Sequence, residues 1–396
     1  MINFYFKKNN LLQRILKIII FFILALYPLY IFPSGSIQIS HFLLLIFSIL
    51  VLAMISISLD KYFYIFLFFL IYCCLVNVFY ASYNIYVFEY YNLILLKELF
   101  FLSFNFIIVI SLISFFDHQN FNHQKKFNVI FYGLASALVL ILLSYFYQFF
   151  FGINSYRFHS FFNNPNQLGY FSLCTFSLIY LLYRNFYISY FLMLSVIIFC
   201  MLLSILTLSK AAILSLFLSA LFVIKPQNYK YSKILTLIFF SLIIFFIIFF
   251  YLDILDTNFF GRLINTLNES DSSLESRGYY IFLEANIPQA IFGMGLNKVH
   301  ELRGYEIHST FMMILSSYGF IGLLFFSLLM LCWVLDIKKS FGLNGVICIC
   351  APSLLYGLTH NGIRFSMFWI VFAISIALSN EFKKLKNHKE HREVQF

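Results

Sequence analysis

The stretch DILDTNFFGRLINTLNESDSSLESRGYYIFLEANIPQAIFGMGLNKVHELRGYEIH, residues 253–308, is the only long polar segment between hydrophobic runs in this chain. It carries several cations, among them Arg262, Arg277, Lys298 and Arg303, and it ends at His308, where a new apolar run begins. Elsewhere the chain is a succession of apolar runs joined by short turns. We therefore expect the helices to hold this one loop in place and the chemistry to occur at it.

The composition is that of a membrane protein. Of the 396 residues, 62% are hydrophobic and only 11% are charged, and the mean hydropathy is +0.90. A soluble domain carries about 25% charged residues, so this chain lacks the polar surface that a soluble fold needs. The apolar runs are continuous rather than alternating, which predicts α-helices rather than a β-barrel. The expected fold class is an all-α polytopic membrane protein.

About twelve transmembrane helices are predicted. The first run follows four cations but precedes no cleavage site of small residues, so it is expected to remain as the first span. The region 168–224 is divided by two short breaks, at Arg184 and at Ser209-Lys210. The predicted spans are residues 15–33, 41–58, 62–82, 92–115, 129–151, 168–183, 186–205, 208–224, 234–252, 309–335, 342–359 and 364–380. Nine spans thus lie in residues 1–252, a large extracytoplasmic loop in 253–308, three spans in 309–380 and a basic cytoplasmic tail in 381–396.

The cations between the spans predict the orientation of the chain. With the N-terminus in the cytoplasm, eighteen Lys and Arg residues fall in cytoplasmic segments and seven in extracytoplasmic ones. Positive residues accumulate on the cytoplasmic side of membrane proteins, so both termini are expected there and the long loop on the opposite side. The same distribution accounts for the net charge of +10 without a nucleic-acid partner.

Neither a metal nor another cofactor is expected. All seven cysteines lie within predicted spans, and none forms a CxxC pair in a loop. The extracytoplasmic segments lack an Asp-x-Asp motif. The nearest sequence, Glu269-Ser-Asp271, is equally well explained by a solvated acidic loop.

Two short motifs lie before and between the middle spans. In RFHSFFNNPNQLG, residues 157–169, Pro165 fixes φ and the flanking Asn164 and Asn166 can bond the backbone, which predicts a turn. This turn is either a simple cap of the next span or, with Arg157, a set of donors for a sugar or phosphate. In TLSKAAI, residues 207–213, Lys210 marks a break and either reaches the lipid headgroups or contacts a phosphate.

Two further motifs belong to the loop and its exit. Arg277 begins a short amphipathic segment, and Gly293 and Gly295 permit a tight turn or a close backbone approach. His308 lies at the N-terminal edge of a span, where the helix dipole disfavours a protonated imidazole, so a neutral ring that accepts a proton is expected. The alternatives are a solvated arginine and an ordinary hydrogen-bonded interfacial histidine. Arg303 and, at the outer edge of the last two spans, His360-Asn361 and Arg364 are further candidates for glycan or lipid contact.

Taken together, the four motifs resemble those of the O-antigen polymerase and O-antigen ligase superfamily of bacterial membrane glycosyltransferases. The resemblance covers roughly residues 157–322: a Pro-Asn turn before a middle span, a Ser-Arg-Gly-like motif, a loop with a Ser-Arg segment and a Gly-x-Gly turn, then a His-Asn-like motif leading into Gly-x-x-Gly. Two positions depart from the pattern. Lys210 stands where the family usually has Arg, which loses the bidentate fork, and Ser309 rather than Asn follows His308.

The resemblance implies a GT-C-like architecture in the bacterial inner membrane, with the active site facing the periplasm. It implies metal-independent, inverting transfer of a glycan from undecaprenyl diphosphate to an acceptor sugar hydroxyl, with a chain-length regulator as a further partner. His308 would be the catalytic base and Arg277 the main cation at the diphosphate. Substrate binding would involve Arg157, Asn164, Asn166, Lys210, Arg303, His360 and Arg364.

Several functions stay open at this stage. A polymerase transfers the glycan to another lipid-linked repeat and a ligase to lipid A-core; we favour the polymerase because such enzymes are numerous and diverse. A protein O-oligosaccharyltransferase is a third option. A lipid-linked oligosaccharide flippase belongs to another class and predicts charged residues deep within several spans, for which Lys97 and Glu98 are the main candidates.

Overall fold

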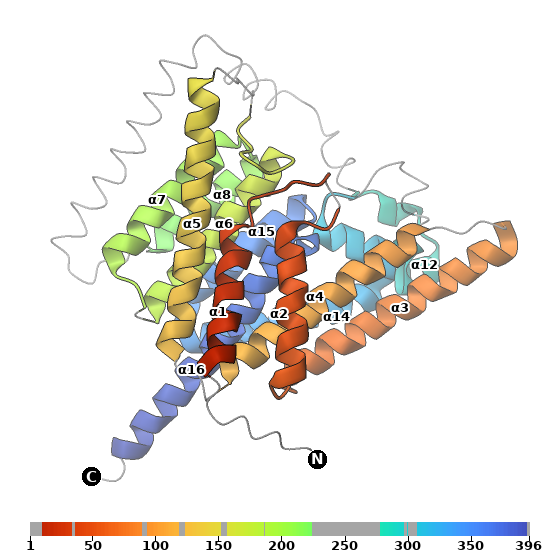
Figure 1. Cartoon of the computed structure of the whole chain (residues 1–396). Helices are drawn as coiled ribbons and strands as arrows, with labels where there is room; N and C mark the ends of the chain where they lie inside the picture. The colour runs from red at the N-terminus through yellow and green to blue at the C-terminus, as the bar shows by residue number, and fades with distance from the viewer. Residues whose placement is uncertain are drawn as a thin grey trace.

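The computed structural model describes residues 10–33, 36–88, 93–118, 123–151, 157–185, 187–223, 278–296, 299 and 307–393. Every regular element in these ranges is a helix, which confirms the all-α prediction for the described part of the chain (Figure 1). Among the described residues, four helical stretches are long and apolar enough to cross a membrane: Lys61–Tyr83, Leu99–Asp117, Phe127–Phe150 and Thr310–Thr359. The fold is therefore that of a helical membrane protein, while twelve spans and a GT-C-like architecture stay predictions.

The helices follow the predicted apolar runs. Each predicted span overlaps a helix except 234–252, which lies outside the described residues. The α-helices are α1 (Asn10–Ala25), α2 (Ile39–Met54), α3 (Lys61–Phe88), α4 (Leu93–Asp117), α5 (His123–Phe150), α6 (Pro165–Arg184), α7 (Tyr190–Leu206), α8 (Lys210–Val223), α12 (Ile287–Phe292), α14 (Thr310–Gly345), α15 (Ala351–Thr359) and α16 (Ser366–Glu393). Two 3₁₀ turns, Ile281–Glu284 and Gly362–Arg364, and a π-helical turn, Val346–Cys350, complete the described elements.

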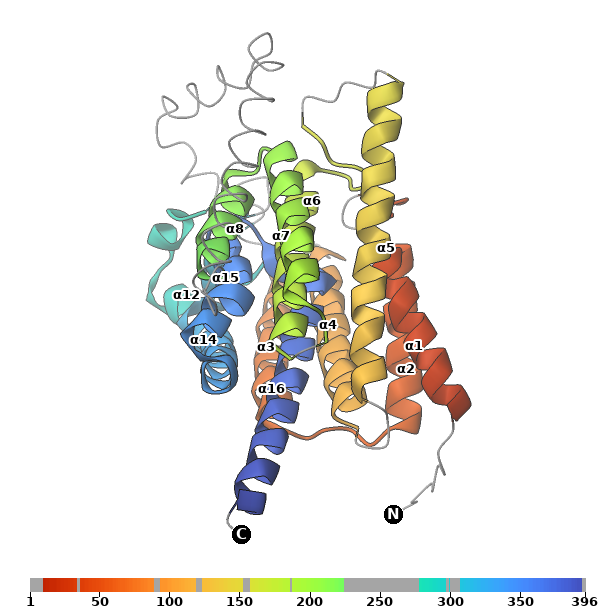
Figure 2. The same ribbon diagram turned by 90° about the vertical axis from the view of Figure 1, so that its left-hand side faces the viewer.

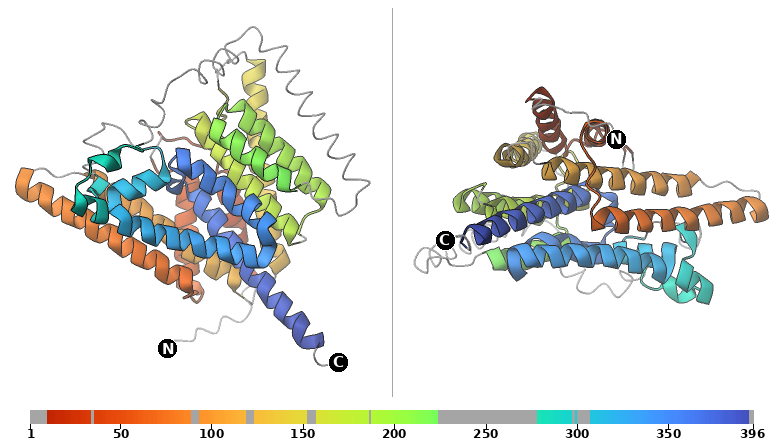
Figure 3. Two further views of the ribbon diagram at one scale, coloured as in Figure 1. Left: turned by 180° about the vertical axis from the view of Figure 1, so that it is seen from behind. Right: turned by 90° about the horizontal axis from the view of Figure 1, so that it is seen from below.

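The centre of the bundle consists of α6 and the first half of α16. Residues 167–182 of α6 and 366–379 of α16 are buried throughout. Helix α4 packs along α16, and α3 packs along α14. Helices α1, α2 and α5 form one flank, and α7, α8 and α15 form the other (Figure 2). Seen from below, α14 lies on one side of α16 and the α1–α2 pair on the other (Figure 3).

Helix α14 contains a break that the sequence prediction did not include. The predicted spans 309–335 and 342–359 are separated at Gly342, which has φ +70°, but a second interruption occurs at Gly319, with φ +66°. Both angles lie in the region that glycine alone adopts easily. The first nine residues of α14 therefore form a short separate helix. The two predicted breaks before it are confirmed, because α6 ends at Arg184 and α8 begins at Lys210.

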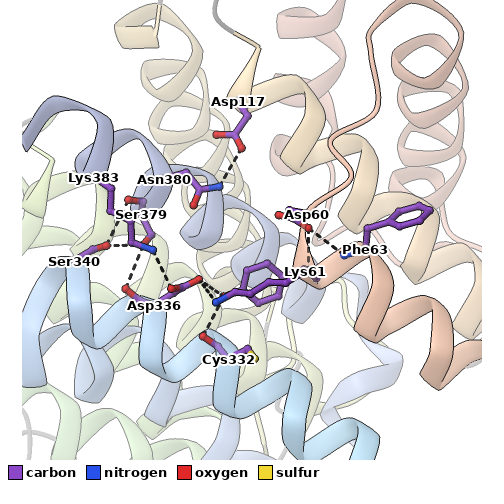
Figure 4. A network of polar contacts seen from close by, with 11 residues as sticks. Asp60, Lys61, Phe63, Asp117, Cys332, Asp336, Ser340, Ser379, Asn380 and Lys383 are labelled. Carbon is purple, nitrogen blue, oxygen red and sulfur yellow. Dashed lines mark hydrogen bonds and ion pairs between the residues drawn. The ribbon is translucent and has the colours of Figure 1, made fainter. Parts of the chain in front are cut away.

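A polar network ties four helices together at one end of the bundle, here called the Asp336 end (Figure 4). Asp336 of α14 forms ion pairs of 2.9 Å with Lys61 of α3 and with Lys383 of α16. Asn380 of α16 donates to Asp117 of α4 at 3.0 Å. These residues come from connections that the charge pattern predicts to share one side of the membrane, and α1 begins and α16 ends at this same end (Figure 1).

Candidate functional site

Predicted site residues gather at the opposite end of the bundle, here called the His308 end. The Asn-Pro-Asn motif forms the start of α6, as the capping alternative predicts. The Asn164 side chain accepts a hydrogen bond from the Gln167 amide at 3.0 Å, and Pro165 occupies the first helical position. A side-chain cap of this kind stabilises a helix by about 1 kcal/mol. Asn164 thus has a structural task, and its role in substrate binding stays a prediction.

Arg157 connects this motif to the second one. Its Nε donates to the Thr207 carbonyl at 2.8 Å, and its Nη2 donates to Asn166 Oδ1 at 2.9 Å. The adjacent Phe158 amide donates to the Leu206 carbonyl at 3.1 Å. Two of the guanidinium donors are therefore directed to the protein itself. Arg157 thus holds the start of α6 against the end of α7. Its partner Thr207 lies three residues before Lys210 in the sequence.

Lys210 is the first residue of α8, and its side chain is exposed. The N-terminus of a helix carries partial positive charge, so a cation at this position is disfavoured by about 0.3–1 kcal/mol. An anion bound nearby would relieve that repulsion. Close packing of α6 against this junction keeps Lys210 near the Asn-Pro-Asn motif, because a Cβ added to Gly169 would lie 3.0 Å from Ala212 Cβ and 3.2 Å from Thr207 Oγ1.

The turn between α15 and α16 joins the same end through Tyr356. The Tyr356 hydroxyl donates to the Asn166 carbonyl at 2.9 Å. Its ring stacks between those of Tyr170 and His360, with centroid distances of 4.4 and 4.5 Å. His360 is thereby placed beside the start of α6. Nothing in the sequence distinguishes Tyr356 from other aromatic residues of a span, so sequence reasoning missed it.

The start of α14 is fastened to this turn by Thr310. Its hydroxyl donates to the His360 carbonyl at 3.0 Å and accepts from the Gly362 amide at 2.9 Å. Ser309 caps α14 by accepting from the Met312 amide, and its neighbour His308 has an exposed side chain. The two histidine segments, 52 positions apart in sequence, therefore adjoin through one hydroxyl.

Within the polar segment 253–308, Gly278 packs close to the start of α14 and Tyr279 contacts the end of α15. A Cβ added to Gly278 would lie 2.8 Å from Ile307 Cγ2, and the Tyr279 hydroxyl donates to the Leu358 carbonyl at 2.7 Å. Gly278, which follows Arg277, thus packs on Ile307, which precedes His308. Arg277 and Arg303 themselves lie outside the described residues.

Two polar side chains of the turn between α15 and α16, Asn361 and Arg364, differ in their surroundings. Arg364 is half-buried and lines a small, partly open pocket with Asn105, Tyr318 and Trp369. The amide oxygen and nitrogen of Asn361 are both buried and have no hydrogen-bond partner. An unsatisfied buried amide costs about 1–3 kcal/mol and calls for an explanation such as a ligand or a water.

The comparisons with known proteins add no relative. A scan against protein-family models finds no match. No curated protein matches the chain either. The resemblance to the O-antigen polymerase and ligase superfamily therefore rests on the four motifs, their order and their placement.

The charged residues at the Asp336 end have a different character. The Asp60 carboxylate accepts from the Tyr62 and Phe63 amides at 3.0 Å and so caps α3. Burial raises the pKa of the Asp60 carboxyl, against the opposing effect of these two amides. Within the described part of the chain, no group of three or more His, Cys, Asp or Glu residues could hold a metal ion. The Asp336 network is therefore interpreted as a structural tie between helices.

Proposed function

We propose that this protein is a membrane glycosyltransferase that polymerises oligosaccharide repeat units carried on undecaprenyl diphosphate. The reaction would occur at the His308 end, which the charge pattern predicts to face the periplasm of a bacterial inner membrane. A ligase that transfers the same kind of glycan to lipid A-core is the alternative, since the two enzymes differ in acceptor rather than donor.

One observation carries this proposal: three motifs that are distant in sequence meet at one end of the bundle. Arg157 bridges Asn166 and Thr207, Tyr356 bridges Asn166 and the His360 turn, and Thr310 bridges that turn and the start of α14. The segments around Asn166, Thr207 and Thr310 belong to three of the four motifs on which the family resemblance rests, and the His360 turn connects them.

The proposed chemistry follows from the charge of the leaving group. Breaking the bond between the sugar C1 and the diphosphate oxygen leaves an additional negative charge on the diphosphate. Fixed cations stabilise such charge, and Lys210 with Arg277 would supply them. His308 would take the proton of the acceptor hydroxyl as its oxygen attacks C1 from the opposite face, which inverts the anomeric configuration. A positioned base contributes about 10²–10⁴-fold in rate.

The base role is tested with purified protein, lipid-linked donor and acceptor. We expect His308→Ala to lose most of its turnover while it remains folded. The matched control is His159→Ala, which changes another histidine of the same end whose Nδ1 is bonded to the Phe162 carbonyl at 2.7 Å. Near-normal turnover in folded His308→Ala would rule out the base role.

The reaction itself is tested by deleting the gene and examining the cell-surface glycan. Single repeats attached to core support the polymerase. Polymer that stays on the lipid carrier supports the ligase, and repeats trapped on the cytoplasmic side support a flippase. An unchanged glycan would contradict all three.

A further inference from the structure

The segment 281–296, which contains α12, packs into the break of α14 (Figure 3). A Cβ added to Gly319 would lie 2.3 Å from the Ile291 carbonyl oxygen and 2.4 Å from the Gly293 nitrogen. A Cβ added to Gly293 would lie 2.2 Å from the Ser317 oxygen. The two glycines therefore permit a backbone-to-backbone contact that no other residue allows.

Hydrogen bonds satisfy the backbone groups that this contact exposes. The Met294 amide donates to the Ser316 carbonyl at 2.9 Å. From α3, the Tyr72 hydroxyl lies 3.0 Å from both the Phe292 and Tyr318 carbonyls, and the Tyr80 hydroxyl donates to the Gly293 carbonyl at 2.7 Å. Broken helices are tolerated in a bilayer only where side chains or neighbouring backbone satisfy the freed groups. The bonds to the Ser316, Phe292, Gly293 and Tyr318 carbonyls fit that requirement.

The contact lies within the expected thickness of the bilayer. The Asp336 ion pairs mark the level on α14 where charge is expected to meet headgroups and water. Gly319 precedes Asp336 by seventeen positions, which is about 25 Å of helix at 1.5 Å per residue. A hydrocarbon core is about 30 Å thick, and any tilt of α14 shortens the perpendicular depth. The junction of Gly293 with Gly319 is therefore on the membrane side of the outer boundary.

The exposed side chains of the segment are apolar, and the segment adjoins α14 where Gly293 meets Gly319. Leu283 and Ile287 are each 77% exposed, and Phe292, the neighbour of Gly293, is exposed as well. From Phe320, the neighbour of Gly319, α14 presents an exposed apolar stripe that continues through Leu324, Leu328, Leu331 and Leu335. Exposed apolar side chains next to the exposed stripe of a span match acyl chains rather than water.

We propose that residues 281–296 form a re-entrant segment that enters the outer half of the bilayer, with Leu283, Ile287 and Phe292 against lipid acyl chains. The long loop then contains a membrane-embedded part, although the sequence predicts a wholly extracytoplasmic segment. This inference goes beyond the proposed glycosyl transfer and does not depend on it.

The test places a tryptophan on the segment and measures which quencher reaches it. Ile287→Trp is purified and reconstituted, and its fluorescence is compared with that of the unaltered protein, whose Trp333 and Trp369 are buried in the bundle. The quenchers are lipids brominated near the headgroup, lipids brominated near the chain end, and aqueous iodide. Leu328→Trp on the α14 stripe is the lipid control, and Lys389→Trp, in the predicted cytoplasmic tail near the end of α16, is the aqueous control.

We expect lipids brominated near the headgroup to remove most of the emission added by Ile287→Trp, and iodide to remove little. The Leu328→Trp emission should respond more to bromine near the chain end. Iodide quenching of Ile287→Trp as strong as that of Lys389→Trp would overturn the proposal. Protection from both quenchers would also overturn it, because a protein partner would then cover the surface. Leu283→Trp repeats the measurement if Ile287→Trp does not fold.

Discussion

Two glycines of α14 offer a matched test of the re-entrant contact. Gly319 has φ +66° and ψ −169°, and Gly342 has φ +70° and ψ −169°, so an alanine meets nearly the same backbone strain at both positions. Their surroundings differ completely. A Cβ at Gly342 has no atom within 4 Å, whereas a Cβ at Gly319 would lie 2.3 Å from the Ile291 oxygen. The difference between the two variants therefore isolates the contact with the segment 281–296.

The size of that difference follows from the bonds that the clash displaces. The shared strain of alanine in this region costs about 1–3 kcal/mol in each variant. In Gly319→Ala the segment must also move away, which breaks the bonds made by the Met294 amide, the Tyr72 hydroxyl and the Tyr80 hydroxyl. A net hydrogen bond is worth about 0.5–1.5 kcal/mol. Gly319→Ala is therefore expected to lose about 2–4 kcal/mol more free energy of unfolding than Gly342→Ala.

The assay is an unfolding titration with a denaturing detergent in mixed micelles, followed by the fluorescence of the buried Trp333 and Trp369. The free energies of unfolding of both variants are compared with that of the unaltered protein. Equal losses in the two variants would refute the reasoning, since they would show that the close contact at Gly319 contributes nothing beyond the backbone strain that both positions share.

Three further predictions concern the two ends of the bundle. Thr310→Val removes the hydroxyl that bonds the buried Gly362 amide and the partly buried His360 carbonyl, so we expect about 2–4 kcal/mol of lost stability and reduced glycosyl transfer. Thr310→Ser keeps the hydroxyl and should stay near normal in both measurements, and equal behaviour of the two variants would contradict the assignment. Arg157→Lys keeps the positive charge but cannot keep both guanidinium hydrogen bonds, to Thr207 and to Asn166. We therefore expect a lower thermal unfolding midpoint and a lower turnover than in the unaltered protein. Unchanged values would show that this link between α6 and α7 is dispensable. Asp336→Asn removes the carboxylate between two lysines that are partly exposed, so we expect a loss of about 1 kcal/mol or more in unfolding titrations. Lys338→Gln, at an exposed lysine nearby, serves as its control. If Lys338→Gln lowers the free energy of unfolding as much as Asp336→Asn does, the Asp336 network makes no particular contribution to stability.

The helical architecture was accessible from the sequence because it depends on local properties. An apolar run of sufficient length forms a helix wherever the backbone must satisfy its own hydrogen bonds. Pro165 favours a helix start by its fixed φ, and Ser209-Lys210 mark another because they interrupt an apolar run. The distribution of cations likewise assigns each connection between helices to one of two predicted sides of the membrane. The contacts of Lys61 with Asp336 and of Arg157 with Thr207 agree with that grouping.

The site was accessible only in part. The motifs around Asn164, Lys210, His308 and His360 were recognisable because they interrupt apolar runs with polar residues. Their bridging residues were not, since Thr310 and Tyr356 are ordinary members of apolar spans until a distant segment is placed beside them.

Hydropathy and charge thus determined by themselves that this chain forms membrane helices and which stretches of the described residues they occupy, because those properties act over a few turns of one helix. The tertiary structure alone decided that Gly293 meets Gly319 and that Thr310 serves the His360 turn. Both contacts join separate elements of the chain, and their energy comes from the close approach of backbones and from hydrogen bonds between elements, which no local pattern encodes.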